Sequence, residues 1–520
     1  MPELVPLDGA RSRRRHRRGI SATSDVEACI QCCITVAKGF AFGDDTRKRK
    51  ASAPQAPIPY LSDEIVVAIL VWLPVKSLLR CRAVCKAWRA IVNDPLFVSA
   101  HLRWSAMRWE QEPSFLVTPV TRDHVIPQED VKERGWPTTF SKQISFYRYQ
   151  WQWQQSASDS DSDNNGHGQQ QTARLMHVKE LGSKSNRVGF FAHCDGLVLA
   201  PTEKELYLLN PATGDAITLP KSHRNNLRHA PRTCHCVGLG LDPRTGKYKV
   251  FQAFYRPVNP YPRFNDYKKV PMGMEFLTLD GGNNEAWTWT ETMEDSMFTL
   301  GSGDDDEAWT ETREDPPRPL LRWQTGVTLK GFIFWRVDTA QYCQSSAGGL
   351  LRLTLELEGF NIIPLPGSMR ICDDFMLDAL HGQGELCLTT RTSDVPSVTI
   401  WMMPVHNDDN YLAMGYAQWE LRYSIPLGLP PHRLCRLMAL VAGGTRILLW
   451  SDFILYEYDL ATSKLSTVCE MDRMRYQGRR TRKWKNLWSF NFVPYTESLF
   501  RIGSLLPVCH YKRLIKPPDH

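Results

Sequence analysis

The chain has 520 residues, of which 42% are hydrophobic and 11% aromatic, so it can bury a large core and form more than one domain. Its formal net charge is +7, but the basic residues gather in two short clusters, Arg11–Arg18 and Arg473–Lys485, and the rest of the chain is mildly acidic. This uneven charge argues against a nucleic-acid-binding surface that extends over the whole protein.

The 14 cysteines are scattered and do not form the regular framework of a small disulfide-rich domain. The apolar run after the first basic cluster is interrupted by Asp25 and Glu27, which does not fit a signal peptide. The longest apolar run, Ile65–Val75, is too short for a bilayer, since a transmembrane helix needs about 20 residues. We therefore expect a soluble intracellular protein of the nucleus, the cytoplasm or both, with reduced thiols and no membrane contact.

Residues 1–56 are predicted to be a disordered basic tail and linker, because arginine runs and small residues are followed by a proline-containing stretch. The cluster Arg11–Arg18 fits either a nuclear-import signal or a plain basic tail. The residues alone do not choose between the two.

Residues 60–104 are predicted to form short helices. Ser62 is a good N-cap, and Ile65, Ile69 and Leu73 recur at helical spacing until Pro74 ends the first helix. A second short helix follows from residue 75, and a third has apolar residues at helical spacing from residue 84 to residue 91. Asp94-Pro95 places a capping carboxylate before a first-turn proline, which predicts a fourth helix through residue 102.

From residue 105 onward the pattern favours strands. The segment Glu205–Pro220 reads as strand, turn and strand, with Asn210-Pro211 starting the turn and Gly214 closing it. Gly238–Tyr255 repeats this design with Asp242-Pro243 and Gly246. Such units, with short turns, suggest a β-propeller, although their irregular period leaves a sandwich or a partly open barrel as alternatives.

Two segments interrupt the predicted strands. Ser156–Gln171 is a polar, low-complexity stretch that we expect to be mobile. Glu285–Asp295 is echoed by Glu307–Asp315, which suggests a short duplication inside an acidic loop.

The stretch from residue 59 to residue 102 resembles the F-box. The resemblance rests on a Leu-Pro pair, a Val-Cys-Lys-x-Trp segment and a closing Asp-Pro-x-Phe, at fixed spacing over some 45 residues. The matching positions are Leu61, Glu64, Ile65, Ile69, Leu70, Leu73, Pro74, Val75, Leu78, Leu79, Arg82, Val84, Cys85, Trp88, Asp94, Pro95 and Phe97. Ser62 stands where the family usually has proline, and serine still caps a helix.

The resemblance implies a small helical module that completes its core against a Skp-family adaptor, which in turn docks on a cullin. A module with apolar residues on several faces is expected to need such a partner. The positions carried over as adaptor-binding are Leu61, Ile65, Leu73, Pro74, Val75, Leu78, Val84, Cys85 and Trp88. Some of them must also hold the helices together, and Trp88 is the favoured anchor because tryptophans dominate interface energetics.

The rest of the chain resembles the plant F-box-associated domain. The matching segments are Cys194–Ala200, Tyr207–Asp215, Gly238–Val250, Leu329–Trp335 and Phe492–Leu499. The resemblance implies a substrate-recognition module with a β-propeller-like fold. The expected fold class is therefore α+β and multidomain, a small N-terminal helical F-box followed by a large all-β domain. The expected domains are 1–56 tail, 57–104 F-box, 105–184 connecting region with the loop 156–171, 185–506 F-box-associated domain and 507–520 tail.

Candidate sites for metals and catalysis are weak. Cys29, Cys32 and Cys33 have no second ligand pair at suitable spacing, and Cys234-His235-Cys236 is too tight for one tetrahedral zinc site. His193-Cys194 and Cys509-His510 are neighbours in sequence, which does not bring their side chains together in a strand. No phosphate-binding glycine motif stands between a strand and a helix. We expect no catalytic residue, no metal and no cofactor.

The function that the residues favour is that of a substrate receptor in an SCF-type ubiquitin ligase, without chemistry of its own. Its expected partners are a Skp-family adaptor, a cullin through that adaptor, and an unknown target protein, with no nucleic acid and no membrane. The acidic segment Glu285–Asp315 and the basic stretch near Arg479 are candidate target contacts. In the basic stretch we expect Trp484 and Trp488 to pack inward. The alternative is an F-box-bearing scaffold or ligand sensor that acts outside ubiquitination.

Overall fold

The computed structural model divides after Phe97 into two compact units, a helical one and a β-rich one, which are described separately. It describes residues 63–502 except 126–137, 152–170, 182–187, 203–204, 223, 225–235, 257–270, 280–307, 322–323, 339–348, 368, 370–373, 381, 393–396, 407–417, 427–434, 452 and 480–483. The expected disordered tails, the loop 156–170 and most of the acidic segment therefore lie outside the described residues.

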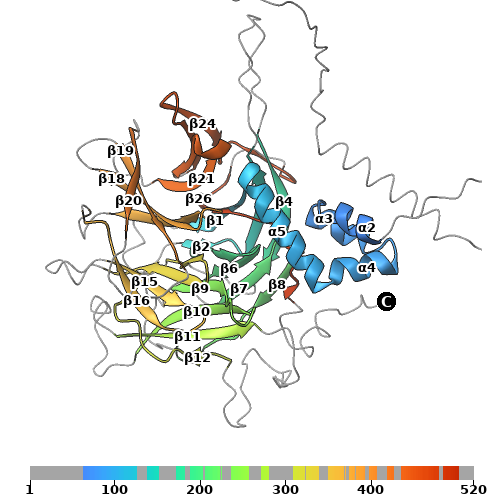
Figure 1. Ribbon diagram of the computed structural model, residues 1–520, viewed down its shortest axis with the longest axis horizontal. Helices are drawn as coiled ribbons and strands as arrows, with labels where there is room; N and C mark the ends of the chain where they lie inside the picture. The colour runs from blue at the N-terminus through green and yellow to red at the C-terminus, as the bar shows by residue number, and fades with distance from the viewer. Residues whose placement is uncertain are drawn as a thin grey trace, which may run out of the picture. The chain divides into compact units, whose positions relative to one another are not determined.

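The helical unit contains three short helices and the beginning of a fourth, shown in blue in Figure 1. They are α2 (Asp63–Leu70), α3 (Val75–Cys81), α4 (Lys86–Asn93) and α5 (Pro95–Gln111). Two predicted starts are confirmed, since Pro74 precedes α3 and Asp94 Oδ1 accepts a hydrogen bond from the backbone N–H of Leu96 at 2.7 Å. The first helix ends at Leu70, earlier than the predicted end at Pro74, and its predicted cap Ser62 lies outside the described residues. The Sγ atom of Cys85 caps α4 by accepting from Trp88 N at 3.4 Å.

The fourth helix continues beyond residue 102 and ends at Gln111, so the strand pattern begins later than the sequence suggested. Near the end of α5 the indole Nε1 of Trp109 donates to the carbonyl oxygen of Ser114 at 2.8 Å, and its ring meets Phe115 edge to face at 6.2 Å. These contacts attach the last turn of α5 to the first strand of the β-rich unit.

In the part of the chain that the structure describes, the β-rich unit has six sheets. Five are antiparallel and are formed by four consecutive strands each, and the sixth contains one short parallel pair among its antiparallel strands. The first is β5 (Ala192–Cys194), β6 (Leu197–Pro201), β7 (Leu206–Asn210) and β8 (Asp215–Thr218). The second is β9 (Val237–Leu241), β10 (Tyr248–Tyr255), β11 (Met272–Leu279) and β12 (Thr310–Glu311). The third is β13 (Val327–Leu329), β14 (Phe332–Arg336), β15 (Gly349–Thr354) and β16 (Phe360–Pro364).

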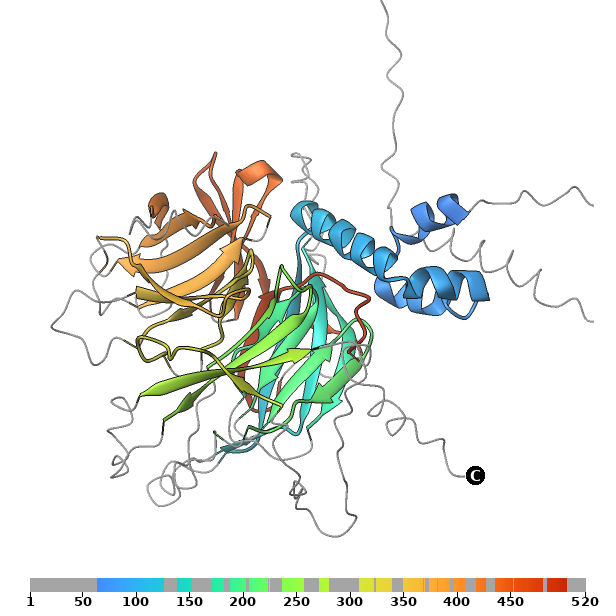
Figure 2. The same cartoon turned by 60° about the horizontal axis from the view of Figure 1, so that its bottom comes forward.

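The fourth sheet is β17 (Phe375–Leu380), β18 (Glu385–Thr392), β19 (Ser397–Pro404) and β20 (Glu420–Pro426). The fifth is β21 (Arg436–Val441), β22 (Arg446–Ser451), β23 (Ile454–Asp459) and β24 (Lys464–Glu470). The sheets are arranged around a common centre, as Figures 1 and 2 show, and the first strands of successive sheets contact one another there. This arrangement is a six-bladed, propeller-like fold.

The sixth sheet takes strands from both ends of the unit. It contains β1 (Ser114–Val125), β2 (Thr138–Phe140), β3 (Gln143–Gln150), β4 (Thr172–Glu180), β25 (Arg475–Tyr476) and β26 (Leu487–Pro494). β1 pairs with β3 on one side and with β26 on the other, in a register that runs from Phe115 opposite Pro494 to Thr121 opposite Leu487. The segment 105–184, which we expected to be a connecting region, therefore contributes four strands to the propeller.

The predicted turns form as expected. Asn210 Oδ1 accepts a hydrogen bond from Ala212 N at 3.0 Å, and Asp242 Oδ1 accepts from Arg244 N at 2.9 Å. Gly214 and Gly246 close these turns with φ angles of 81° and 68°, values that a residue with a Cβ adopts only at a cost. Local chemistry therefore sets these two hairpins.

Six apolar clusters fill the spaces between neighbouring sheets, one cluster for each pair. Along β1 the side chains alternate, since Phe115 and Val117 pack against β21–β24 while Leu116 packs against β5–β8. Both faces of the sixth sheet are thus buried. A two-layer sandwich would bury only one face of each sheet, and a barrel would be one continuous sheet, so both alternatives to a propeller are excluded.

We expect Phe492→Ala to lower the free energy of unfolding by about 3–5 kcal/mol, because it opens a cavity beside the closing strand pair. The Phe492 side chain is buried and stacks on Phe115 with ring centroids 4.8 Å apart. Urea denaturation monitored by tryptophan fluorescence measures the change. Trp488→Ala on the same strand is the control, since Trp488 is 54% exposed, and should cost about 1 kcal/mol or less. Equal losses in the two variants would contradict this account of closure.

Candidate functional site

Two regions carry features of a binding site, one in each unit. In the helical unit, α2 and the turn after it expose a row of apolar side chains, Ile65 at 49%, Ile69 at 39% and Trp72 at 53%. The spacing of four residues places Ile65 and Ile69 on one face of α2. Trp72 follows in the turn, where its backbone N–H donates to the carbonyl oxygen of Ile69 at 3.2 Å. Exposed large hydrophobic groups on one face of a small helical unit are typical of a protein-binding surface.

The residues carried over from the F-box resemblance fall into three groups. Leu73, Val75 and Leu78 are buried in the chain itself, so they contribute to packing of the helices. Pro74, Val84 and Trp88 are half-buried, whereas Ile65 and Cys85 are exposed. Leu61 lies outside the described residues. Contact of these residues with an adaptor stays a prediction.

Sequence reasoning did not include Ile69 and Trp72 among the adaptor-binding residues. Helical spacing from Ile65 to Ile69 was visible in the sequence. The exposure of Trp72 was not, because the residue lies in the turn after α2 and its direction depends on how that turn closes.

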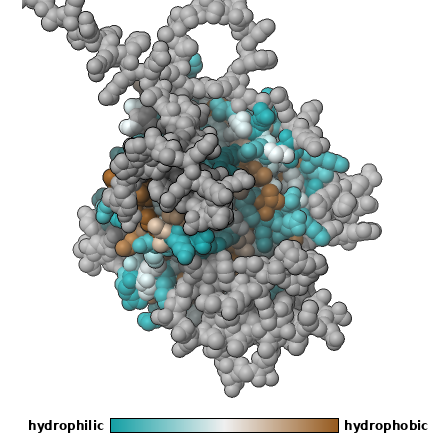
Figure 3. Space-filling view, turned by 90° about the vertical axis from the view of Figure 1, so that its right-hand side faces the viewer, coloured by the Kyte–Doolittle hydropathy of each residue, from teal (hydrophilic) through white to brown (hydrophobic). Residues whose placement is uncertain are grey.

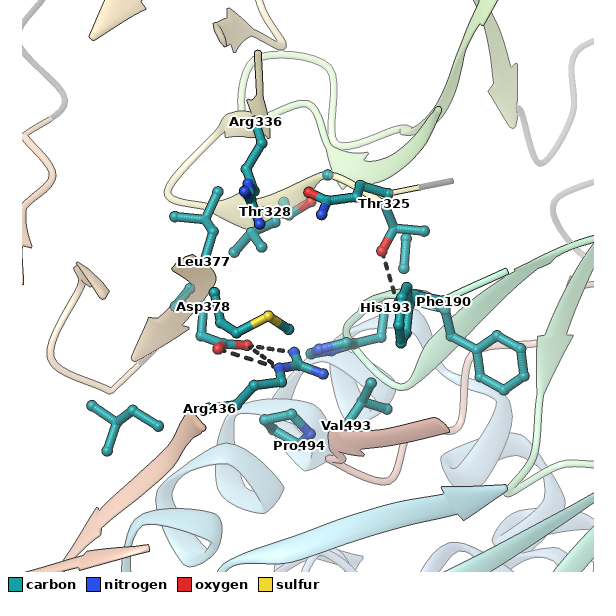
Figure 4. Close-up of a pocket in the computed structure, with 18 of the residues that line it drawn as sticks. Phe190, His193, Thr325, Thr328, Arg336, Leu377, Asp378, Arg436, Val493 and Pro494 are labelled. Carbon is teal, nitrogen blue, oxygen red and sulfur yellow. Dashed lines mark hydrogen bonds and ion pairs between the residues drawn. The ribbon is translucent and has the colours of Figure 1, made fainter. Parts of the chain in front are cut away.

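In the β-rich unit a cavity of about 80 Å³ lies at the centre of the propeller, between the first strands of several sheets. Its wall includes His193 on β5, Thr325 and Thr328 around β13, and Asp378 and Arg436 on β17 and β21 (Figure 4). Side chains that are far apart in sequence therefore meet in one place, as ligand-binding groups do at the centre of closed β folds.

One side of the cavity is formed by a tight ion pair. The Nε atom of Arg436 lies 3.0 Å from Oδ1 and 3.3 Å from Oδ2 of Asp378, and Nη2 also donates to Oδ1. The two side chains are 14% and 9% exposed. Burial raises the pKa of the Asp378 carboxyl above its usual value, and the charge of Arg436 opposes this shift.

The other side of the cavity carries Arg336, at the end of β14 (Figure 4). Its guanidinium lies over the ring of Phe375 at 4.1 Å and donates to the backbone carbonyl of that residue. Nη2 lies 3.2 Å from Oδ1 of Asp374, whose side chain is 76% exposed. Burial lowers the pKa of Arg336, since a guanidinium removed from water is less stable as a cation.

The expectation that both tryptophans of the basic stretch pack inward is half right. Trp484 meets Tyr476 edge to face at 5.0 Å within a buried cluster, and Arg479 lies 3.4 Å above its ring. Trp488 is 54% exposed instead, and Arg122 lies 3.4 Å above it. Trp488 lies where the pairing of β26 with β1 shifts register, between Ser489 opposite Val120 and Leu487 opposite Thr121. This irregularity interrupts the alternation that would otherwise place Trp488 on the same face as Phe490 and Phe492.

The carboxylates at the described end of the acidic segment form partly exposed ion pairs with arginines of the propeller. Glu311 lies 2.6 Å from Arg224 Nε and 2.9 Å from Arg256 Nη2, and Asp315 also pairs with Arg256. These two carboxylates are therefore paired with arginines next to the second sheet of the same unit. The remainder of the segment, from residue 285 to residue 307, lies outside the described residues.

Candidate metal and nucleophile residues give no assembled site in the part of the chain that the structure describes. There, no three His, Cys, Asp or Glu side chains converge in a way that suits a metal ion. Burial raises the pKa of the Cys194 thiol well above its usual value, which keeps the thiol protonated. Cys29, Cys32, Cys33, Cys234, His235, Cys509 and His510 fall outside the described residues. None of the described helices is long and apolar enough to cross a membrane.

The exposed surface shown in Figure 3 mixes hydrophobic residues, in brown, with hydrophilic residues, in teal. Among the described residues the large hydrophobic side chains most exposed on the surface are Leu96, Leu357, Met107, Trp488 and Trp72. They are distributed over both units, and single exposed side chains of this kind are ordinary on a protein surface.

Comparison with known proteins identifies both units. A family model described as the F-box associated beta propeller domain matches residues 139–411, more than half of the chain, and an F-box-like model matches residues 63–103. An F-box/LRR-repeat protein of Arabidopsis thaliana is 20% identical over 372 residues, which cover 70% of this chain and 67% of that protein. Another F-box protein of Arabidopsis thaliana is 23% identical over 34% of this chain, and the match spans only 38% of that relative.

Among solved structures, oligogalacturonate lyase from Vibrio parahaemolyticus is 8% identical with a TM-score of 0.33. The alignment covers 68% of this chain and 79% of that chain. This likeness is too distant to bear on function.

We expect Arg436→Met to lower the free energy of unfolding by about 3–5 kcal/mol near neutral pH, because it leaves the buried Asp378 carboxylate without its partner. Asp378 already has a raised pKa in the folded state, and loss of Arg436 raises it further. The folded state then binds a proton more tightly than the unfolded state, so stability is present at low pH and falls as pH rises through the folded pKa. Denaturation of the variant and of the wild type at pH 5 and pH 8 should show the smaller difference at pH 5.

The double variant Asp378→Asn/Arg436→Met is the control for this titration. It removes the ionisable carboxyl, so its stability relative to the wild type should change little between the two pH values. If Arg436→Met lowers the free energy of unfolding by the same amount at both pH values, the pH dependence cannot be assigned to titration of Asp378.

Proposed function

The chain belongs to the plant F-box proteins that carry a C-terminal F-box-associated β-propeller domain, and from this premise we propose that it is the substrate-recognition subunit of an SCF-type ubiquitin ligase. In such a complex the F-box docks on a Skp-family adaptor, which binds a cullin. The propeller holds the target protein. The observation that carries the proposal is the presence in one chain of an F-box with an exposed apolar face and a complete propeller.

The mechanism that follows is positional. The propeller binds a target, the F-box fixes the propeller to the ligase, and a lysine of the target is thereby held near the charged conjugating enzyme. Tethering raises the effective concentration of the lysine without any bond being made by the receptor. F-box proteins of this family are generally non-catalytic, and the proposed role needs no catalytic group in this chain.

On the F-box the row Ile65, Ile69 and Trp72 is proposed to meet the adaptor together with the half-buried Trp88. Burying these side chains removes apolar surface from water, at about 25 cal/mol per Å². Leu73, Val75 and Leu78 support this surface from below by fixing the positions of α2 and α3. Truncation of those three would test folding as much as docking.

We expect Ile65→Lys to abolish co-purification of the full chain with a Skp-family adaptor, because it places a charge in an apolar contact. The helix should remain, since the side chain is 49% exposed in the free chain. Val67→Lys is a matched control, because Val67 is 38% exposed on the same helix but points about 200° away from Ile65. Circular dichroism establishes that both variants fold.

Retention of the adaptor by folded Ile65→Lys would reject this docking surface. Loss in both variants would assign the effect to the helix as a whole. Transfer of ubiquitin to a co-purified partner, lost with Ile65→Lys, separates the ligase from a scaffold that binds the adaptor outside ubiquitination.

A further inference from the structure

The charges around the central cavity are unevenly compensated. Three basic side chains, Arg336, Arg436 and His193, line the cavity, and Asp378 is the one carboxylate among its described lining residues. Asp378 is fully engaged by Arg436 through both of its oxygens. That pair is neutral as a unit, so it leaves the charge of Arg336 on the opposite side of the cavity to be balanced elsewhere (Figure 4).

The counter-ion of Arg336 is weak. The Arg336 side chain is only 12% exposed, whereas the side chain of Asp374 is 76% exposed and therefore strongly screened by water. The Nε atom of Arg336 is buried and has no hydrogen-bond partner. A guanidinium removed from water with one donor unused is stabilised more by a better-buried anion than by Asp374.

The guanidinium is also held in place before any ligand arrives. It stacks on the ring of Phe375 at 4.1 Å and donates to the carbonyl of the same residue. Fixing an arginine in advance lowers the entropy cost of binding, and its planar array of donors matches the two oxygens of a carboxylate.

The size of the cavity limits the ligand. A volume of about 80 Å³ holds about six water molecules, at roughly 10–15 Å³ each by this measure. That space suits one short acidic side chain and is too small for a nucleotide or a folded element. The remaining wall contains both apolar side chains, such as Phe190 and Leu377, and polar ones, such as Thr325 and Thr328.

We propose that the central cavity of the propeller is a carboxylate-binding site, in which Arg336 receives an aspartate or glutamate side chain of the target protein. The statement that this carboxylate belongs to a target protein rests on the proposed function. Binding of the carboxylate itself does not, because it is a property of the propeller alone. The entering carboxylate takes the place of Asp374 on the guanidinium.

The test uses the full chain and two small probes, N-acetyl-aspartate methylamide and its neutral counterpart N-acetyl-asparagine methylamide, at matched ionic strength. The dissociation constant follows from the rise in melting temperature with probe concentration. We expect the acid to bind and the amide not to bind. Arg336→Gln should raise the dissociation constant of the acid at least tenfold, since a charge-assisted hydrogen bond is lost.

Arg422→Gln is the matched control. Arg422 lies on β20 away from the cavity lining and pairs with Glu385 and Glu420, so the affinity for the acid should be unchanged. Asp374→Asn is a second variant at an exposed position, which removes the competing carboxylate and should lower the dissociation constant by about two- to fivefold. This variant keeps the proposal testable if Arg336→Gln does not fold.

Equal binding of acid and amide, unchanged affinity in Arg336→Gln, or unchanged or weaker affinity in Asp374→Asn would each overturn the proposal. Inorganic phosphate that binds in an Arg336-dependent manner, while the acid does not, would overturn the carboxylate assignment. Loss of the adaptor interaction in the experiment on Ile65 leaves these results unaffected. A failure of the receptor role and a failure of the cavity are therefore distinguishable.

Discussion

The pairing of β1 with β26 is the interaction on which the β-rich unit depends. It joins residues 381 positions apart, as in the hydrogen bond from Ser114 Oγ to the carbonyl oxygen of Tyr495. Without it the sheets would form an open row with two apolar faces in water, because the first and fifth sheets each pack on the sixth. Closure therefore covers the apolar faces of all six sheets and joins them into one core.

The central cavity is a consequence of this closure. Its lining comes from around β5, β13, β17, β21 and β26, which approach one another only when the ring is complete. The Arg436–Asp378 pair joins two neighbouring sheets, and Arg436 Nη1 also lies 3.4 Å from the carbonyl oxygen of Phe492 on the closing strand. The charged groups and the closing strand are thus parts of the same arrangement.

The two units differ in how much of their apolar surface they bury. The propeller buries both faces of its sheets between neighbours, whereas the helical unit leaves Ile65, Ile69 and Trp72 in water. A short helical unit has too little volume to cover all of its apolar side chains. The propeller is therefore closed on itself, whereas the helical unit keeps apolar surface for the docking that we propose.

Local chemistry in the sequence determined the helix boundaries at Pro74 and Asp94 and the hairpins at Asn210 and Asp242, because a cap or a turn involves residues within a few positions of one another. The F-box pattern was readable for the same reason. Only the tertiary structure decided that strands β1 to β4 complete the propeller and that Arg336, Asp378 and Arg436 surround one cavity. These features depend on pairing between distant strands, and the residues of one strand do not by themselves specify which distant strand it pairs with.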